Sequence, residues 1–400
     1  MIRIGINASF ARKPNTGIGQ VTLNFLKKLS ALRIENRNLH ELEFILYLEE
    51  DLPKNLPEDT ALPGNFTKKI FLPPWKRDDL FRKIWWEKYL LPRKVRADKC
   101  DVLISLYQSA TSIQPHKEVK HIVVVHDIIP KLFPEYLNNW RKKLYWKLTE
   151  GAIKKADKLI AISRRTEKDL VQHLGIDPKN ITVSYIDVDE IYKPDVSEEK
   201  SRKVMEKYDL VPGYLYTGGG LEKRKNTEGL IHAYKMLLER NKKEHFIHDF
   251  PDLVVSGKLM PQLAPLILDI EKLVRKLNFT QHIHILDFVP QEDLPALYKN
   301  AEVFVYPSLY EGFGLPVLEA MNQGTPVITA KNSSLPEVGW DSVLYCDPKD
   351  VEDLAMTIKN ALINKKLRTT LSVRGKERAR NFSWDKFAEK MLNIVNEGNF

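Results

Sequence analysis

Short apolar runs recur along the chain, and segments with helical spacing separate them. Such runs, rich in Val, Ile and Leu and lacking polar alternation, are typical of strands buried on both faces of a parallel sheet. Parallel neighbours are joined by crossovers, usually helices, so the pattern predicts a doubly wound α/β fold. The predicted strands are residues 2–6, 44–48, 102–106, 121–127 and 158–163 in the first half, and 214–219, 252–257, 283–288, 303–308, 325–330 and 343–347 in the second.

The two series of strands predict two α/β domains. A chain of 400 residues is too long for one ordinary hydrophobic core. The segment IYKPD, residues 191–195, resembles a linker between the two series. We therefore expect domains at residues 1–193 and 194–382, with a ligand held between the carboxyl ends of the two sheets.

Composition limits where the protein works. The chain is 43% hydrophobic and 29% charged, as in folded globular proteins, and its net charge of +9 suits a phosphate-bearing ligand or an anionic surface. Cys100 and Cys346 are too few for a disulfide framework. The first residues alternate as a strand does, unlike a signal peptide, and no apolar run is long enough to span a membrane. We expect a cytoplasmic protein, with peripheral membrane attachment as an open alternative.

The stretch EGFGLPVLE, beginning at Glu311, follows a predicted strand and opens a helix. Gly312 and Gly314 allow a tight turn and a close approach of the backbone to a ligand. Pro316 suits the first turn of a helix, where an N–H is not needed. The amides around Gly314–Val317 then favour an anion such as a phosphate.

Two glutamates flank this turn. Glu319, one helical turn further on, is placed to accept hydrogen bonds from a ribose diol, and Glu311 from another polyol. Phosphate, ribose and polyol together describe a nucleotide-sugar. The alternative is a helix cap with surface glutamates, which is the better interpretation of Glu319 taken alone.

The same residues carry a family resemblance. The run from Glu311 to Glu319 resembles the E-x7-E signature of retaining glycosyltransferases of family 4, which have the GT-B architecture of two Rossmann-like domains facing across a cleft. Further motifs stand in the family's order across the whole chain: TGIGQ (16–20), HDIIP with FPE (126–135), ADKLIAIS (156–163), EKRKN (222–226), GTPVI (324–328), LPEV (335–338) and FSWDKFA (382–388).

The resemblance implies roles for individual residues. It places the nucleotide-sugar in the C-terminal domain, the acceptor in the N-terminal domain, and the last helix, about 383–400, back on the N-terminal domain. The implied catalytic residues are His126, Glu311, Arg224 and Lys225. The implied donor-binding residues are Gly17, Gly19, Gly218, Arg224, Lys225, Glu311, Gly312, Phe313, Gly314, Leu315 and Glu319.

Arg224 and Lys225 follow the first predicted strand of the second domain. Adjacent cations at a strand end suit a departing diphosphate, although a solvated basic turn has the same spacing. The resemblance favours the diphosphate, since the family places an Arg-Lys pair here. Many relatives carry a further basic residue directly after the strand, where this chain has Gly219.

Three motifs are less specific. Gly17 and Gly19 form a glycine turn without the third glycine of a dinucleotide motif, because position 22 is Thr22; in the family this loop approaches the donor phosphate and the acceptor. His126 ends a strand, as structural histidines often do, and the family has a sugar-contacting histidine there. Ser163 is expected to cap the helix that follows it.

Two further segments have open alternatives. Asp187–Asp189 imitates a D-x-D metal motif, but it lies far from the donor residues in the sequence, and we expect no metal. In residues 74–99, Trp75, Phe81, Trp85, Trp86 and Tyr89 alternate with Arg and Lys. This segment predicts either an amphipathic helix on an anionic membrane or a helix packed on the N-terminal domain. No nucleic-acid motif accompanies it.

The sequence thus predicts a retaining glycosyltransferase. The GIGQ, HDIIP and RKN variants resemble bacterial polysaccharide mannosyltransferases, so GDP-mannose is the first donor expected, ahead of other GDP-, UDP- or dTDP-sugars. The expected acceptor is a lipid-linked or growing saccharide, and no cofactor is expected. Two other classes remain as alternatives: a nicotinamide-dependent oxidoreductase, which the incomplete glycine motif disfavours, and a non-catalytic basic module that binds membranes or nucleic acid.

Overall fold

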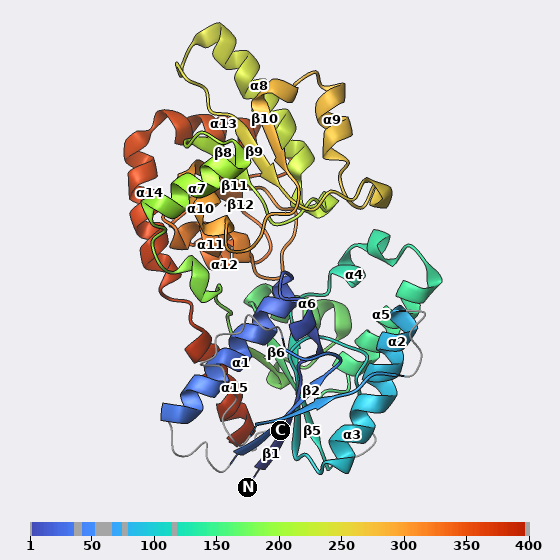
Figure 1. Cartoon of the computed structure of the whole chain (residues 1–400). Helices are drawn as coiled ribbons and strands as arrows, with labels where there is room; N and C mark the ends of the chain where they lie inside the picture. Colours follow the sequence, from blue (N-terminus) through green and yellow to red (C-terminus); the bar gives the residue numbers. More distant parts are fainter. Residues whose placement is uncertain (1, 36–41, 53–65, 74–78, 114–117, 397–400) are drawn as a thin grey trace. The chain divides into compact units, whose positions relative to one another are not determined.

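The computed structural model describes residues 2–35, 42–52, 66–73, 79–113 and 118–396. The chain divides into two compact units, Met1–Ile186 with Ser383–Phe400, and Asp187–Phe382. These units, called the N-terminal and C-terminal domains below, each contain a parallel sheet flanked by helices (Figure 1). The prediction of doubly wound α/β domains is confirmed. The division falls after Ile186 rather than after residue 193.

The described residues of the N-terminal domain form a seven-stranded parallel sheet in the order β3-β2-β1-β4-β5-β6-β7. The order reverses between β1 and β4, which places the topological switch point of this sheet at their carboxyl ends. Its strands are β1 Ile2–Asn7, β2 Leu42–Leu48, β3 Phe66–Ile70, β4 Val102–Ser105, β5 Lys120–Val125, β6 Lys158–Ala161 and β7 Ile181–Val183.

Two strands of this sheet, β3 and β7, escaped prediction because both are edge strands. β3 carries Lys68 and Lys69, with little of its length buried, and β7 has only three residues. An edge strand pairs on one side only, so it needs no continuous apolar run. The apolar pattern therefore marks the centre of the sheet and not its borders.

Helices of the N-terminal domain cover the sheet in separate clusters. Trp86 and Val95 pack against β2 and β4, while Trp146 and Leu170 pack against β5 and β6. The helices are α1 Gly17–Glu35, α2 Asp79–Trp85, α3 Leu91–Ala97, α4 Ile129–Leu132, α5 Trp140–Ile153 and α6 Arg164–Leu174, with a π-helical turn, Trp86–Leu90, joining α2 to α3.

The described part of the C-terminal domain forms a six-stranded parallel sheet in the order β10-β9-β8-β11-β12-β13, with its switch point between β8 and β11. Its strands are β8 Tyr214–Thr217, β9 Leu253–Ser256, β10 Ile283–Leu286, β11 Ala301–Tyr306, β12 Val327–Ala330 and β13 Leu344–Cys346.

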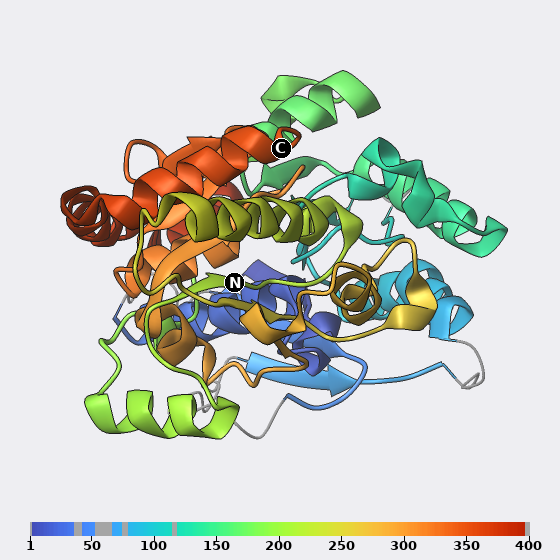
Figure 2. The same cartoon turned by 90° about the horizontal axis from the view of Figure 1, so that it is seen from above.

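The helices of the C-terminal domain lie on both faces of this sheet. α8 and α13 run side by side over one face (Figure 2), where Leu230, Leu237 and Ile358 belong to one apolar core with β8 and β9. The helices are α7 Glu198–Tyr208, α8 Thr227–Glu244, α9 Ile270–Lys276, α10 Leu294–Asn300, α11 Leu315–Asn322, α12 Leu335–Gly339, α13 Val351–Ile363 and α14 Lys365–Ala379.

The last described helix, α15 (Trp384–Asn396), belongs to the N-terminal domain. It packs on α1, where the rings of Phe25 and Phe387 lie 5.9 Å apart edge to face and Lys28 pairs with Asp385 at 3.3 Å. No helix among the described residues is long and apolar enough to cross a membrane.

Candidate functional site

The predicted glycine turn and helix start are present at the carboxyl end of β11. Gly314 precedes α11 with a φ of 114°, a conformation that favours glycine, and a Cβ there would lie 2.8 Å from Leu335. Ser334 Oγ donates hydrogen bonds to the carbonyls of Glu311 and Phe313, at 2.9 and 2.7 Å. The turn is therefore held by the N-terminal end of α12.

Four expected donor residues of this turn contribute their backbones more than their side chains. The ring of Phe313 is buried against Phe382, with centroids 5.7 Å apart. Gly312 and Gly314 carry no side chain. Leu315 begins α11, so its amide belongs to the helix N-terminus.

Arg224 and Lys225 converge on Glu311. They lie on the short 3-10 helix Lys223–Lys225, which follows β8, and both donate to Oε1 of Glu311 at 2.8 Å. Ser308 Oγ and the Tyr306 hydroxyl donate to the same oxygen, at 2.7 and 2.9 Å. A single carboxylate oxygen thus receives two cations and two hydroxyls at the switch point of the C-terminal sheet.

These contacts set the charge of the cluster. Although burial opposes ionisation, Lys225 and Arg224 lower the pKa of Glu311 to about 2. Burial also lowers the pKa of Lys225, against the opposing effect of Glu311. We assign Glu311 as ionised and Lys225 as protonated at neutral pH, because each then keeps its charged partner at hydrogen-bond distance.

Glu319 has a different environment from Glu311. Its side chain is buried on α11 and accepts one hydrogen bond, 2.8 Å long, from the Tyr298 hydroxyl of α10. Burial raises the pKa of Glu319 to about 7, and the Tyr298 hydrogen bond and Lys225 only partly oppose this. The interpretation of Glu319 as an exposed surface glutamate is wrong.

Glycines 218 and 219 explain how closely the β8 loop is packed. A Cβ on Gly218 would lie 2.8 Å from Ser256 Oγ, and one on Gly219 would lie 2.9 Å from the ring of Pro316. Gly219 also has a φ of 92°. A basic side chain at position 219 does not fit this backbone.

In the N-terminal domain, His126 follows β5 and is buried. Its Nε2 lies 2.9 Å from the carbonyl of Leu106, and burial lowers the pKa of the ring. A neutral imidazole must donate from Nε2 to that carbonyl, which leaves Nδ1 as an acceptor. Ser163 accepts a hydrogen bond from the Thr166 amide, so the predicted helix cap is confirmed.

The predicted turn at Gly17 and Gly19 is instead the first turn of α1. The helix begins earlier than its apolar spacing indicates, because Thr16 Oγ1 accepts a hydrogen bond from the Gly19 amide and acts as a cap. A Cβ on Gly19 would lie 1.9 Å from the carbonyl oxygen of Lys13, whereas one on Gly17 meets nothing within 4 Å. The nearby Lys13 carbonyl thus requires glycine at position 19, and of these two glycines only Gly17 leaves space for a ligand.

Asp187 and Asp189 have structural contacts. Asp187 is buried and pairs with Lys193 at 2.9 Å. Asp189 caps the short helix Glu190–Tyr192 by accepting a hydrogen bond from the Ile191 amide. The described part of the chain holds no group of three or more His, Cys, Asp or Glu side chains that could bind a metal ion.

The aromatic segment 74–99 divides into a buried and an exposed side from residue 79 onward; residues 74–78, with Trp75, lie outside the described residues. Trp86 is fully buried, stacks on Phe71 at 5.3 Å and donates Nε1–H to the Phe71 carbonyl. Of the two alternatives for this segment, packing on the domain therefore holds for Trp86. Trp85 remains 53% exposed.

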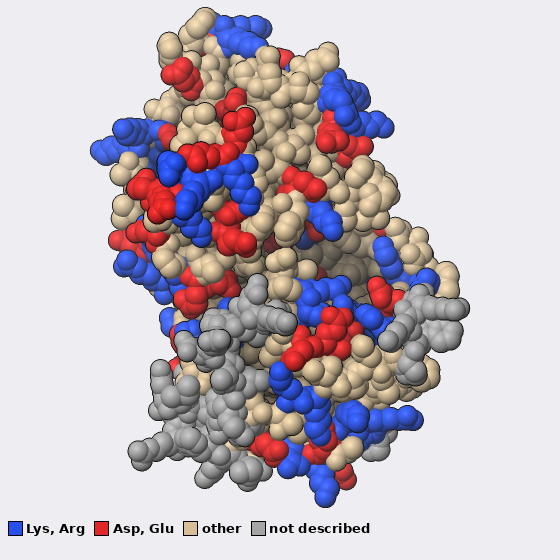
Figure 3. All heavy atoms as spheres, in the orientation of Figure 1, with Lys and Arg blue, Asp and Glu red and all other residues tan. Residues whose placement is uncertain are grey.

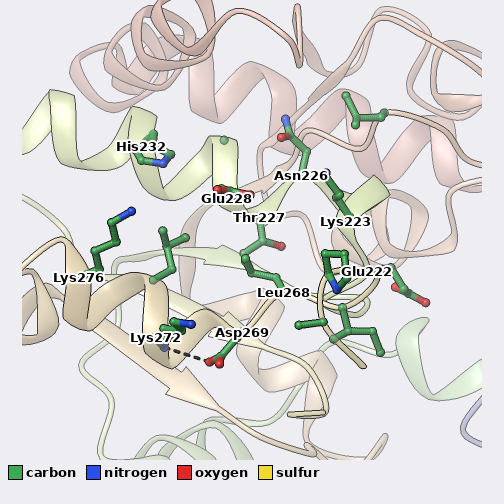
Figure 4. Close-up of a pocket in the computed structure, with 16 residues that line it drawn as sticks. Glu222, Lys223, Asn226, Thr227, Glu228, His232, Leu268, Asp269, Lys272 and Lys276 are labelled. Carbon is green, nitrogen blue, oxygen red and sulfur yellow. Dashed lines mark hydrogen bonds between the residues drawn. The ribbon is translucent and has the colours of Figure 1, made fainter. Parts of the chain in front are cut away.

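A cavity of about 510 Å³ lies beside the short 3-10 helix Lys223–Lys225, between α8 and α9 (Figure 4). Lys223, Lys272 and Lys276 line it together with Glu222, Glu228 and Asp269, over an apolar floor that includes Leu268. Its lining includes none of Arg224, Lys225, Glu311 and Glu319. The cluster around Glu311 therefore lies next to this cavity and does not line it.

Sequence reasoning missed Tyr306, Ser308 and Tyr298. Tyr306 and Ser308 belong to the strand end VFVYPS, and their position at the carboxyl end of β11 was a usable signal. Tyr298 gave no signal, because it lies on α10 and meets Glu319 only in the folded domain.

Both halves of the chain are similar to known glycosyltransferases. The family model described as "Glycosyl transferases group 1" matches residues 198–378, and the one described as "Glycosyltransferase Family 4" matches residues 16–189. Over 384 residues the chain is 30% identical to O-antigen chain mannosyltransferase B of Escherichia coli, covering 95% of this chain and 96% of that relative.

Two solved structures illustrate the shared fold. The sucrose-phosphate synthase of Thermosynechococcus elongatus aligns with a TM-score of 0.73 and 18% identity, covering 99% of each chain. HepE of Anabaena, in complex with UDP and glucose, aligns with a TM-score of 0.72 and 17% identity, covering 99% of this chain and 100% of that chain. The predicted pair of Rossmann-like GT-B domains is confirmed.

Proposed function

The chain belongs to glycosyltransferase family 4, and from that premise we propose that it transfers mannose from GDP-mannose to a lipid-linked or growing saccharide, with retention of configuration. The observation that carries the choice of mannose is the 30% identity to an O-antigen mannosyltransferase along nearly the whole length of both chains. The product would enter a cell-surface polysaccharide.

The donor would bind at the switch point of the C-terminal sheet. Arg224 would bind the diphosphate through the forked N–H groups of its guanidinium, and Lys225 through its compact ammonium charge. The backbone of Gly218 and the N-terminus of α11 would also face the diphosphate. Glu319 would accept from the ribose diol, and Glu311 would contact the hydroxyls of the transferred sugar. Support comes from the buried Arg224–Lys225–Glu311 cluster, which holds both cations at the sheet edge where nucleotides bind.

The chemistry would depend on electrostatic stabilisation of the departing diphosphate. As negative charge develops on the leaving oxygen, Arg224 and Lys225 offset it at a site already shielded from water. Oε1 of Glu311 is occupied by four donors, and ionised Glu311 is needed to hold the two cations, which makes it a poor nucleophile. We therefore propose that the leaving diphosphate takes the proton of the acceptor hydroxyl. Both groups then lie on one face of an oxocarbenium-like sugar. No cofactor or metal enters this scheme.

The proposed membrane-binding surface of the protein is the exposed side of α2 and of the π-helical turn. Phe81, Trp85 and Tyr89 recur every four residues and are 44, 53 and 47% exposed. The same helices carry basic side chains, Arg82 and Lys83 on α2 and Lys94 and Arg96 on α3, and Figure 3 shows lysine and arginine side chains on the surface of this domain. Aromatic rings flanked by lysine and arginine suit an anionic membrane face, which would bring the enzyme to a lipid-linked acceptor on the cytoplasmic side.

The donor is tested by a thermal-shift screen against GDP-mannose and other GDP-, UDP- and dTDP-sugars, since a ligand of the native state raises the melting temperature. UDP-glucose is the main competitor, because HepE was solved with UDP and glucose. The anomeric configuration of the product, read by NMR, then tests retention. If UDP-glucose alone shifts the melting temperature and supports transfer, mannose is the wrong sugar.

The diphosphate assignment is tested with a matched pair of lysines. Lys225→Ala should weaken GDP binding by the value of a charge-assisted hydrogen bond, about 1.5–3 kcal/mol. Lys223→Ala is the control, since Lys223 is exposed on the same short helix and lines the neighbouring cavity. Equal affinities of both variants in calorimetry would contradict the assignment.

A further inference from the structure

Cationic side chains gather at the carboxyl end of the N-terminal sheet, in a cluster that contains none of the donor residues proposed in the C-terminal domain. Arg12 and Lys13 follow β1, and Arg82 and Lys83 lie on α2. Two of the ammonium groups face one ring, because Lys13 Nζ lies 5.8 Å and Lys83 Nζ lies 4.9 Å from the centroid of Phe10. Elements far apart in the sequence therefore bring like charges together.

The place of this cluster in the fold is that of a ligand site. β1 lies between β2 and β4, where the strand order reverses, and open α/β sheets bind ligands outside the carboxyl ends of the strands at that point. Phe10 comes from the segment after β1, and Tyr107 from the segment after β4; their rings are 4.4 Å apart. Lys83 lies over both rings.

Three acidic groups face the four cations of the cluster, and one of them, Glu87, pairs with Lys83 at 3.7 Å, so a net positive charge remains among the described residues. Glu49 is buried between Arg12 and Arg82, at 3.5 and 3.6 Å, and its Oε2 accepts no hydrogen bond from the described residues. Glu87 is fully buried and already receives the hydroxyls of Tyr107 and Tyr145 and the Ala110 amide. The third acid, Asp79, is 91% exposed beside Arg82.

Unused donors accompany this charge. The Nε–H groups of Arg12 and Arg82 are buried and have no hydrogen-bond partner among the described residues. Burial lowers the pKa of Lys13, and the charges of Arg12 and Lys83 lower it further. Buried donors without partners are costly and like charges repel, so the cluster is unfavourable as it stands, and an anion bound beside it would relieve the repulsion.

We propose that this cluster binds a phosphate group of the acceptor, with Lys13 and Lys83 as its direct contacts and Arg12 and Arg82 behind them. The acceptor is then a sugar phosphate or a lipid-linked sugar diphosphate, and a neutral saccharide is a poorer substrate. Lysine and arginine are the side chains that recognise phosphate in proteins. Gly17, in the first turn of α1 beside Lys13, leaves open space for such a group. This inference rests on the proposed transferase function.

The binding experiment uses the full chain with its donor site filled by saturating GDP, so that Arg224 and Lys225 are not available to the probe. Calorimetry compares mannose, mannose 1-phosphate and a short-chain polyprenyl diphosphate sugar. We expect both phosphate probes to bind and mannose to bind at least tenfold more weakly, about the value of one charge-assisted contact. If Lys13→Gln lowers the affinity for the polyprenyl probe alone, the phosphate comes from a lipid-linked acceptor. If Lys13→Gln also lowers the affinity for mannose 1-phosphate, a soluble sugar phosphate suffices.

The variants separate a phosphate contact from a structural effect. Lys13→Gln removes charge at an exposed position and should weaken both phosphate probes about tenfold, whereas Lys13→Arg should retain them. Lys168→Gln, at an exposed position of α6 in the same domain, is the control. In transfer assays, Lys13→Gln should raise KM for the phosphate-bearing acceptor, whereas Lys168→Gln should not.

Two results overturn the proposal. One is that neither phosphate probe binds once GDP fills the donor site. The other is that Lys13→Gln binds both probes as the wild type does. The binding measurement does not depend on turnover. If the wild-type protein binds the phosphate probes but transfers no sugar, the proposed transferase function is wrong and the phosphate site still stands.

Discussion

Replacing Glu311 by Gln should destabilise the C-terminal domain by about 3 kcal/mol at neutral pH. The substitution keeps the shape of the side chain and removes its charge, so Arg224 and Lys225 lose their shared counter-ion. The pKa of Glu311 falls from its ordinary 4.5 to about 2 in the folded domain. That difference of 2.5 units, at about 1.36 kcal/mol per unit, corresponds to roughly 3 kcal/mol. Removing one partner of a buried ion pair costs a similar amount, about 3–5 kcal/mol.

The pH dependence of this loss identifies its cause. Because the folded pKa is depressed, the stability that Glu311 contributes is fully present above about 4.5 and is lost as the pH falls toward about 2. The gap between wild type and Glu311→Gln should therefore be widest at neutral pH and narrow steadily below pH 4.5. A variant that merely packs badly would show the same gap at every pH.

Urea denaturation is the assay, followed on the transition of the C-terminal domain because a two-domain chain need not unfold in one step. A double-mutant cycle with Lys225→Met isolates the ion pair, and the double variant should be less impaired than the sum of the two single variants. A loss below about 1 kcal/mol at pH 7, or one that does not change between pH 7 and pH 4, would refute the reasoning.

Three further predictions follow from the buried groups. Glu319→Gln should be more stable than the wild type at pH 8 and not at pH 5, because the raised pKa of about 7 makes the wild type lose stability as the pH rises through 7; thermal melts at the two pH values measure this. Trp86→Ala should cost about 3–5 kcal/mol of unfolding free energy, while Trp85→Ala should stay within about 0.5 kcal/mol and weaken co-sedimentation with anionic vesicles. Gly19→Ala should destabilise the N-terminal domain by about 1–3 kcal/mol in denaturant titrations, because its Cβ meets the Lys13 carbonyl, and Gly17→Ala is the control that should not.

Local patterns in the sequence predicted whatever depends on neighbouring residues. The apolar runs identified the central strands, Pro316 marked the start of α11, and Ser163 was recognised as a cap. Each rests on a preference that acts within a few residues. The edge strands β3 and β7 were missed because an edge imposes no apolar run, and the start of α1 was missed because Thr16 supplies its cap.

The segment after residue 79 shows where local patterns stop being informative. Trp85 and Trp86 are adjacent and chemically identical, yet one is half exposed and the other is fully buried against Phe71. A helix places successive side chains about 100° apart, so the sequence shows that the two differ in direction but not which one faces the domain. The partner that decides, Phe71, lies 15 residues away at the end of β3.

The two glutamates that flank the turn before α11 show the same limit of local patterns at the functional site. Spacing assigned the two carboxylates to different hydroxyls and said nothing of their ionisation, and the folded domain gives them pKa values of about 2 and about 7. Arg224 lies 87 residues from Glu311 along the chain and reaches it only because β8 and β11 are neighbours in the sheet. Glu319 faces Tyr298 on α10, which offers one hydroxyl and no charge. Ionisation at this site is thus decided by strand order, a property of the whole domain, and the two positions should respond to pH in opposite directions.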